Sequence, residues 1–288
     1  MQATIFDDTP CTLGEGPLWH PERAELFWCD ITAGRLYARG EDGARRDWQF
    51  DGAVSALGWV DRDTLLIAQE RALLRFDIAG GTFDTVIALE SDMPHTRSND
   101  GRADPFGGFW IGTMGHDAEK DAGAIYRYHK GELRQLYAPW TIPNAQCFSP
   151  DGAFAYLTDT TKGGLLRVAL DRDGWPKAEP EPFGPLDGAD YRPDGAVTDA
   201  EGNIWIAHYG KAMVSCHAPA DGAERARIAL PASQTTCPAF GGAGLDRLFV
   251  TSATQKLSLD QLAEDPQAGC TFVVETGARG LPEHRVIL

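Results

Sequence analysis

Short hydrophobic runs, cut by turn residues, make up almost the whole of this chain. The runs are separated by Gly, Pro, Asp and Asn, which is the pattern of β-strands joined by tight turns. A helical pattern is found only at residues 257–266, where Ser258 is placed to cap the helix and Pro266 to end it. The pattern therefore predicts an all-β protein with one short helix.

One type of run recurs six times along the chain. The copies begin at Leu26, Leu65, Phe109, Ala155, Ile204 and Leu248 and read LFWCDI, LLIAQE, FWIGTM, AYLTDT, IWIAHY and LFVTSA. Successive copies begin 39, 44, 46, 49 and 44 residues apart, close to the roughly 40–50 residues of a four-stranded propeller blade. Other β proteins also carry aromatic strands at loose intervals, but here each copy brings its preceding turn with it.

The repeat predicts a single domain over residues 1–288, a six-bladed β-propeller with four-stranded blades. We expect residues 3–8 and residues 284–288 to pair within one blade. Such pairing would close the ring and remove an exposed sheet edge.

Polar residues fall at one position of this repeat. Eleven or twelve residues before the second residue of each run, the chain carries Glu15, Ser55, Asn99, Asn144, Asp194 and Cys237. The first strand of each propeller blade lines the central channel, so we expect these positions to converge at one mouth of the channel. Two carboxylates and two amides in a partly buried funnel need compensation, either from hydrogen bonds with water or from a cation. The oxygen atoms of these two carboxylates and two amides, with no His or Cys among the four residues, suit Ca²⁺, Mg²⁺ or Mn²⁺ as ligands. Zn²⁺ or Fe²⁺ stay open.

Composition narrows the class of partner. A formal net charge of −16 argues against nucleic acid or an anionic membrane, and no apolar run is long enough for a transmembrane helix. The N-terminus lacks a basic region followed by an apolar stretch, so no secretion signal is predicted. The six cysteines are scattered without a CxxC pair, which is typical of reduced thiols. We therefore expect a cytoplasmic protein whose partner is a small molecule or a metal ion.

Five segments, in this order, resemble the senescence-marker protein (regucalcin), gluconolactonase and related sugar-lactonase family. They are LGEGPLWHPERAELFWCDI, RSNDGRADPFGGFWIGTM, NAQCFSPDGAFAYLTDT, PDGAVTDAEGNIWIAHYG and FGGAGLDRLFVTSA. The resemblance covers nearly the whole chain and points in particular to the bacterial sugar-acid pathway lactonases. It implies a six-bladed propeller, in agreement with the repeat, and hydrolysis of a sugar lactone to the aldonic acid.

The resemblance also implies roles for six residues. They are Glu15, Asn144 and Asp194 as ligands of one divalent metal ion, and Arg97, Asn99 and Asp117 as contacts to the substrate. Two positions depart from the family pattern: Asp117 stands where some relatives have glutamate, and Ala145 follows Asn144 where the family usually has glycine. Whether Asp117 or His116 contacts the substrate stays open.

A mechanism follows as a hypothesis. Lactone hydrolysis needs a polarised carbonyl, a nucleophilic water and a stabilised oxyanion, and one divalent cation can serve all three. Asp194 is the expected general base, because a ligand that also touches the water of the metal can accept its proton. Arg97 and Asn99 are expected to bind the ring hydroxyls or the carbonyl oxygen.

Two other functions stay open. A metal-dependent hydrolase of the phosphotriesterase type would use a similar site, although Arg97 and Asp117 suit a polyhydroxylated substrate better. A non-enzymatic calcium-binding propeller would concentrate polar residues on the rim, whereas here they are predicted on the axis. No GxSxG motif is present to support a serine hydrolase. The sequence does not identify the sugar lactone, its ring size, the physiological metal or the oligomeric state.

Overall fold

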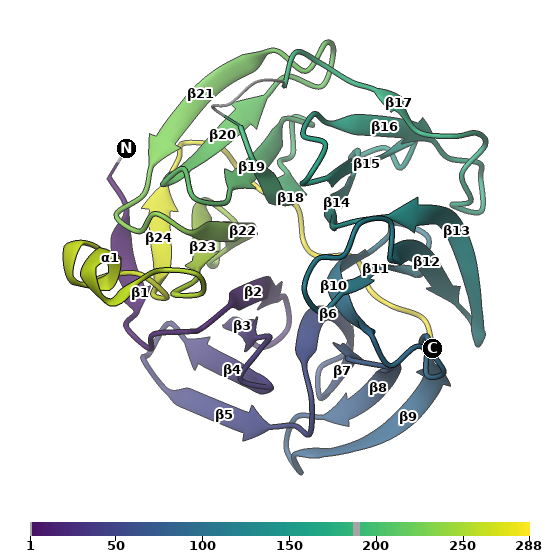
Figure 1. Ribbon diagram of the computed structural model, residues 1–288, viewed down its shortest axis with the longest axis horizontal. Helices are drawn as coiled ribbons and strands as arrows, with labels where there is room; N and C mark the ends of the chain where they lie inside the picture. The colour runs from purple at the N-terminus through teal and green to yellow at the C-terminus, as the bar shows by residue number, and fades with distance from the viewer. Residues whose placement is uncertain (1, 187–190) are drawn as a thin grey trace.

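Six antiparallel sheets of four strands surround a central axis (Figure 1). The computed structural model describes residues 2–186 and 191–288. Five sheets are built from four consecutive strands, and the sixth combines the last three strands with the first. The predicted all-β fold, a six-bladed propeller with four-stranded blades, is therefore confirmed.

The strands fall into four concentric sets. The innermost are β2 (Gly14–His20), β6 (Val54–Asp61), β10 (Thr96–Ala103), β14 (Pro143–Phe148), β18 (Pro193–Thr198) and β22 (Thr235–Gly241). The second are β3 (Glu25–Asp30), β7 (Thr64–Gln69), β11 (Phe109–Gly115), β15 (Phe154–Asp159), β19 (Ile204–His208) and β23 (Arg247–Ser252). The third are β4 (Arg35–Gly40), β8 (Ala72–Asp77), β12 (Gly123–His129), β16 (Leu166–Ala169), β20 (Met213–His217) and β24 (Thr271–Glu275). The outermost are β5 (Arg45–Gln49), β9 (Thr82–Ala88), β13 (Glu132–Trp140), β17 (Glu181–Pro182), β21 (Glu224–Ala229) and β1 (Thr4–Asp7).

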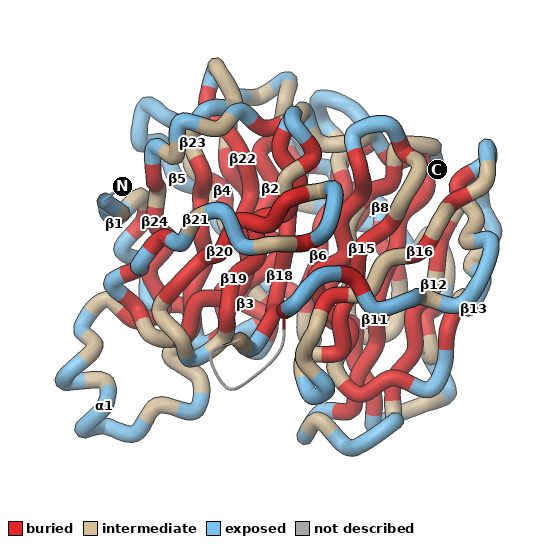
Figure 2. The backbone as a smooth tube through the Cα atoms, turned by 90° about the horizontal axis from the view of Figure 1, so that it is seen from above, coloured by how far each residue is buried: buried red, intermediate tan, exposed pale blue. Residues whose placement is uncertain are grey.

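The six repeated runs form the second strands, which explains their apolar and aromatic character. The second residue of each run packs in a different hydrophobic cluster, and each cluster joins two neighbouring blades. These residues are Phe27, Leu66, Trp110, Tyr156, Trp205 and Phe249. The repeat therefore records the packing between blades, where a strand is covered on both faces. Figure 2 shows these buried strands between exposed loops on the two faces of the propeller.

Ring closure follows the prediction at one end of the chain only. The first strand, β1, pairs with β24, with Ile5 opposite Phe272. The expectation that residues 284–288 join the same blade is wrong, because β24 already supplies the neighbour of β1. Beyond β24 the chain instead crosses the back of the ring (Figure 1), where Val286 N donates to Trp59 O at 2.9 Å.

Each innermost strand carries an irregularity at the same place. The pairing with the second strand shifts between Glu15 and Leu18, Val54 and Ala56, Ser98 and Gly101, Asn144 and Cys147, Pro193 and Ala196, and Thr235 and Pro238. A β-bulge locally redirects side chains. The bulges coincide with the repeat position that holds the polar residues, so the same distortion recurs in all six blades.

The remaining expectations concern smaller features. The helix α1 (Leu259–Glu264) begins after Ser258, as predicted. The Ser258 side chain accepts from Gln261 N, and the two residues form a capping box. All six cysteines are free and buried. Within the described residues no helix is long and apolar enough to cross a membrane.

Candidate active site

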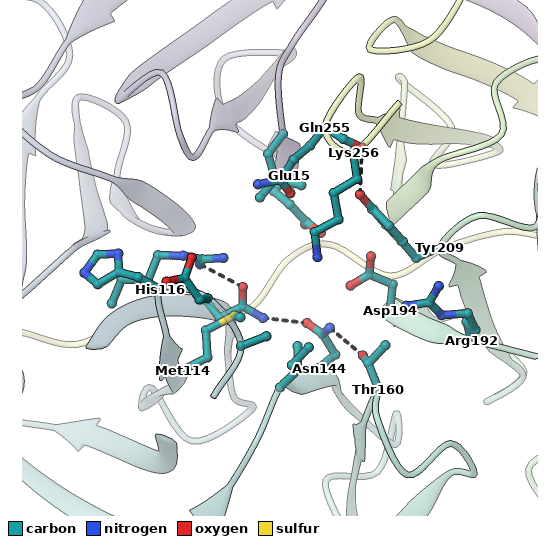
Figure 3. A pocket seen from close by; sticks show the side chains of 16 residues that line it. Glu15, Met114, His116, Asn144, Thr160, Arg192, Asp194, Tyr209, Gln255 and Lys256 are labelled. Carbon is teal, nitrogen blue, oxygen red and sulfur yellow. Dashed lines mark hydrogen bonds between the residues drawn. The ribbon is translucent and has the colours of Figure 1, made fainter. Parts of the chain in front are cut away.

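A cavity of about 230 Å³ opens at one mouth of the central channel (Figure 3). Its volume lies just below the usual range of ligand pockets, about 300–1,000 Å³. Its lining includes all six residues singled out in the sequence, namely Glu15, Arg97, Asn99, Asp117, Asn144 and Asp194. They come from β2, β10, β14 and β18 and from the loop after β11. The structure thus brings together residues far apart in the chain, and their roles stay predictions.

Hydrogen bonds run in one direction through polar side chains of two blades to a backbone carbonyl of a third. Arg97 Nη1 donates to Asn99 Oδ1 at 3.0 Å, and Asn99 Nδ2 donates to Asn144 Oδ1 at 3.0 Å. Asn144 Nδ2 donates to Thr160 Oγ1 at 2.8 Å, and Thr160 Oγ1 donates to Pro193 O at 2.7 Å. These hydrogen bonds fix the orientation of the Asn99 and Asn144 side-chain amides. Asn144 Oδ1 keeps a second lone pair for another partner.

Glu15 and Asp194 are buried carboxylates without an ion-pair partner among the described residues. Glu15 Oε2 accepts a hydrogen bond from Gly16 N at 2.9 Å. Burial, and then the nearby charges of Asp194 and Asp100, raise the pKa of Glu15 well above its usual range. Burial and Asp100 also raise the pKa of Asp194. The two groups therefore lack the compensation that buried charges normally have.

Asp100 adds a third carboxylate below the cavity. Its Oδ2 accepts from Gln146 N at 3.0 Å, and burial raises the pKa of Asp100 to about 6. Two cations act against this build-up of negative charge, since Arg192 and Arg97 lower the pKa of Asp194 in part. The mouth is consequently rich in acidic groups that a cation would stabilise.

The donor set fits a hard divalent cation. Nowhere in residues 2–186 and 191–288 does a group of three or more His, Cys, Asp or Glu stand ready to hold a metal. The candidate ligands are instead two carboxylates and one amide oxygen, a mixture that Ca²⁺ and similar ions accept. The uncompensated burial of Glu15 and Asp194 supports this fit.

Ala145 adopts the backbone conformation that glycine would favour. Its φ is +58° and it is fully buried, and Gly16, at the same repeat position, has a φ of +55°. A left-handed conformation costs a non-glycine residue about 1–2 kcal/mol. The bulge beside Asn144 therefore forms with an alanine at the position where the resemblance predicts glycine.

Asp117 and His116 both line the cavity from an exposed loop. Asp117 N donates to Glu119 Oε2 at 3.0 Å, and His116 Nε2 lies 3.6 Å from Glu70 Oε1. Neither side chain is buried against the fold, so the question of which one contacts substrate stays open.

Sequence reasoning missed the residues that complete the wall of the cavity. They include Met114, Ile142, Thr160, Arg192, Tyr209, Gln255 and Lys256. Tyr209 ends the run IWIAHY, so the repeat could have drawn attention to it. Arg192 and Lys256 lie in loops that share no repeated pattern, and no signal in one sequence marks them.

Comparison with known proteins identifies the family. Residues 13–254 match the family model described as "SMP-30/Gluconolactonase/LRE-like region". The chain is 42% identical over 272 residues to a putative sugar lactone lactonase of Rhizobium meliloti (strain 1021), covering 93% of this chain and 91% of the relative. It is 36% identical to the L-arabinolactonase of Azospirillum brasilense over 290 residues, covering 99% and 95%.

A solved structure gives the same result. The calcium-binding protein regucalcin from Agrobacterium tumefaciens strain C58 superposes with a TM-score of 0.97 at 40% identity, covering 100% of this chain and 98% of that one. Lactones are cyclic carboxylic esters, so the names of the relatives agree with the predicted enzyme class, a hydrolase of such esters. The chain belongs to the SMP-30/gluconolactonase/LRE-like family.

Proposed function

We propose that this protein hydrolyses a sugar lactone to the open-chain aldonic acid and holds one divalent metal ion with Glu15, Asn144 and Asp194. The observation that carries the proposal is a pair of buried carboxylates without ion-pair partners in the described residues, set beside an amide oxygen at the channel mouth. The names of two relatives, a sugar lactone lactonase and an L-arabinolactonase, support the reaction. The calcium-binding neighbour supports a divalent cation.

Asp194 is the proton acceptor of the proposed reaction. When bound, a divalent cation would polarise the ester carbonyl as a Lewis acid. No hydrogen-bond donor is fixed on the Asp194 carboxylate by the described residues, whereas Glu15 accepts from Gly16 N. Asp194 can therefore take a proton from the attacking water. It then gives that proton to the ring oxygen as the ester C–O bond breaks, which restores the carboxylate.

Arg97 and Asn99 hold the sugar ring in the proposed complex. Arg97 Nη1 donates to Ser98 O at 2.8 Å as well as to Asn99 Oδ1, so its guanidinium is fixed in the wall of the cavity. Its remaining N–H groups can donate to ring hydroxyls or to the carbonyl oxygen. Asp117 can accept from hydroxyl groups on the open side. This arrangement suits a small polyhydroxylated substrate.

The test combines elemental analysis with a substrate panel. Metal content is measured on the purified protein, which is then stripped and reloaded in turn with Ca²⁺, Mg²⁺, Mn²⁺, Zn²⁺ and Fe²⁺. Acid release is followed from arabinono-, xylono-, galactono- and gluconolactone, with a phosphotriester as the rival substrate. We expect hydrolysis of at least one lactone that requires a single bound metal. Full activity of the stripped protein would refute the metal-dependent mechanism.

A matched pair of variants assigns the site. Glu15→Gln should lose both the metal and the activity, while Asp246→Asn, at an exposed carboxylate, should keep both. Loss of activity with the metal retained would remove Glu15 from the ligand set.

A further inference from the structure

Two cations on the wall of the cavity have no assigned contact to the substrate or the metal in the proposed reaction. They are Arg192 and Lys256, both exposed and both without an ion-pair partner in the described parts of the chain. Figure 3 shows Arg192 beside Asp194, across the cavity from His116 and Met114, and Lys256 near Gln255 and Glu15 with its side chain directed toward the middle of the cavity. Two cations from separate loops therefore face the cavity.

Tyr209 holds the two cationic loops in place. Its N–H donates to Arg192 O at 2.9 Å, and its hydroxyl donates to Gln255 O at 3.1 Å. The Arg192 guanidinium lies 5.7 Å from the centre of the Tyr209 ring, within reach of a cation–π contact. Gln255 N donates to Thr12 O at 2.9 Å, and Lys256 has a φ of +65°, which non-glycine residues rarely adopt. Both cations thus stand on backbone that is fixed before any ligand binds.

The charges of the described cavity lining balance only as long as its carboxylates are free, and Asp100 below the cavity adds one further carboxylate. The charged residues of its lining are Glu15, Asp117 and Asp194 against Arg97, Arg192 and Lys256. A divalent ion on Glu15 and Asp194 would cancel these two ligands and leave three cations facing one carboxylate. In a chain with a net charge of −16, the cavity then becomes a local electropositive site. A neutral sugar lactone makes no use of that charge.

We propose that the substrate is a sugar lactone that carries a second anionic group, a carboxylate, sulfonate or phosphate, and that Arg192 and Lys256 bind this group. The inference rests on the proposed function and narrows its substrate class. Charge-assisted hydrogen bonds from a guanidinium and an ammonium are the strongest contacts available for such an anion. Asp117 on the far side repels the anion and accepts from hydroxyls, so the ring enters in one orientation.

The kinetic test uses two lactones with the same ring. D-Glucono-1,4-lactone carries a hydroxymethyl group at C6, and D-glucaro-1,4-lactone carries a carboxylate there. We expect the metal-loaded protein to have a kcat/KM at least about tenfold higher for the glucarolactone. A 6-phosphogluconolactone arm separates phosphate from carboxylate as the preferred anion.

The variants locate the effect. Lys256→Met should lower kcat/KM for the anionic lactone about tenfold and change that for gluconolactone less than about twofold. Arg192 also lowers the pKa of Asp194, so the effect of Arg192→Met is read from ligand binding and not from turnover. Lys177→Met and Arg225→Met, which remove exposed cations that do not line the cavity, should change neither value. An equal loss on both lactones in Lys256→Met would overturn the proposal, because Lys256 would then serve the reaction itself.

A binding measurement keeps the inference separate from turnover. Calorimetric titration with open-chain glucarate and gluconate should show about tenfold tighter binding of glucarate, and both variants should remove the difference. High salt should reduce the preference of the unaltered protein for glucarate, since both cations are exposed. If no lactone is hydrolysed, the proposed function fails and this titration still decides whether the anion site exists. Equal binding of the two acids by the unaltered protein would refute it.

Discussion

The two mouths of the central channel treat charge in opposite ways. At the mouth with the candidate site, Glu15 and Asp194 are buried, and the described residues provide no ion-pair partner for either. At the other mouth the chain after β24 crosses the channel, and Glu283 pairs with Arg102 with 9% and 11% of the side chains exposed. Trp59 Nε1 also donates to Glu283 O at 2.8 Å. The buried charges are paired at the far mouth, whereas at the mouth with the candidate site Glu15 and Asp194 have no ion-pair partner in the described residues.

The difference shows where the fold gains stability and where it gives some up. A paired buried charge becomes costly only when its partner is removed. An unpaired buried carboxylate costs stability in the native protein itself, and such a cost is typical of sites arranged for a ligand. The two mouths should therefore respond to mutation with opposite signs.

Removal of Asp194 should have the largest effect on function. Asp194→Asn removes the proposed proton acceptor, so kcat for lactone hydrolysis should fall by about 10³-fold or more. The metal-free protein should become more stable to urea, because one of several buried like charges is gone. Steady-state acid release and urea unfolding measure the two changes. A kcat within tenfold of the native value would contradict the assignment of Asp194.

Removal of Glu283 should destabilise the far mouth of the channel, because it breaks the ion pair with Arg102. Glu283→Ala leaves Arg102 buried without its partner and should cost about 3–5 kcal/mol in the free energy of unfolding. The kcat of the folded variant should be unchanged, because the pair lies at the far mouth. The double variant Arg102→Met/Glu283→Leu replaces both charges by apolar groups and should recover most of the loss. If the single variant costs less than about 1 kcal/mol, the pair does not hold this mouth together.

Asp100 lies between the two mouths and should make the stability of the metal-free protein depend on pH. Its pKa is raised by burial to about 6, so the folded state binds a proton more tightly than the unfolded state. Stability contributed by this group is therefore lost as pH rises from about 4 to about 6 and is level above that range. Removing the group should relieve the loss.

A comparison of stability curves measures this effect together with the influence of Asp100 on Glu15 and Asp194. The free energy of unfolding of Asp100→Asn, minus that of the native chain, should increase by about 2–3 kcal/mol between pH 4 and pH 7. Buried histidines such as His208, whose pKa is lowered to about 3 by burial, are present in both proteins and cancel. A flat difference curve would show that Asp100 is not charged differently in the two states.

The repeat in the sequence predicted the axis of the molecule better than its periphery. Glu15, Asn144 and Asp194 could be placed together because cyclic symmetry forces equivalent positions to converge, whatever their separation along the chain. Arg192 and Lys256 could not, because their loops differ from blade to blade and only tertiary contacts such as those of Tyr209 bring them to the cavity.

The prediction for residues 284–288 failed for a related reason. Their apolar pattern shows that they bind an edge or a surface, but not which one. The choice depends on Trp59, which accepts from Val286 N and donates to Glu283 O, more than 220 residues away in the chain. Pairing partners of that separation leave no periodic trace in a single sequence.

Ala145→Gly should have the smallest effect on the free energy of unfolding. It tests the backbone of the bulge beside Asn144, at the mouth with the candidate site. Relief of the left-handed conformation, about 1–2 kcal/mol, is opposed by the chain entropy of glycine, about 0.5–1 kcal/mol, and by the loss of one buried methyl group, about 0.8 kcal/mol. The free energy of unfolding should thus change by less than about 1 kcal/mol, and metal content should not change.

Gly16→Ala is the matched control, because it places a methyl group at the same repeat position of another blade. There a Cβ would lie 2.6 Å from Ser55 O, so strain and a backbone clash add and the loss should exceed about 2 kcal/mol. Urea unfolding of both variants measures the contrast. Equal effects would mean that the space beside the bulge does not decide which residue the position accepts. A small change at Ala145 beside a large loss at Gly16 would show instead that the bulge next to Asn144 has space for a side chain.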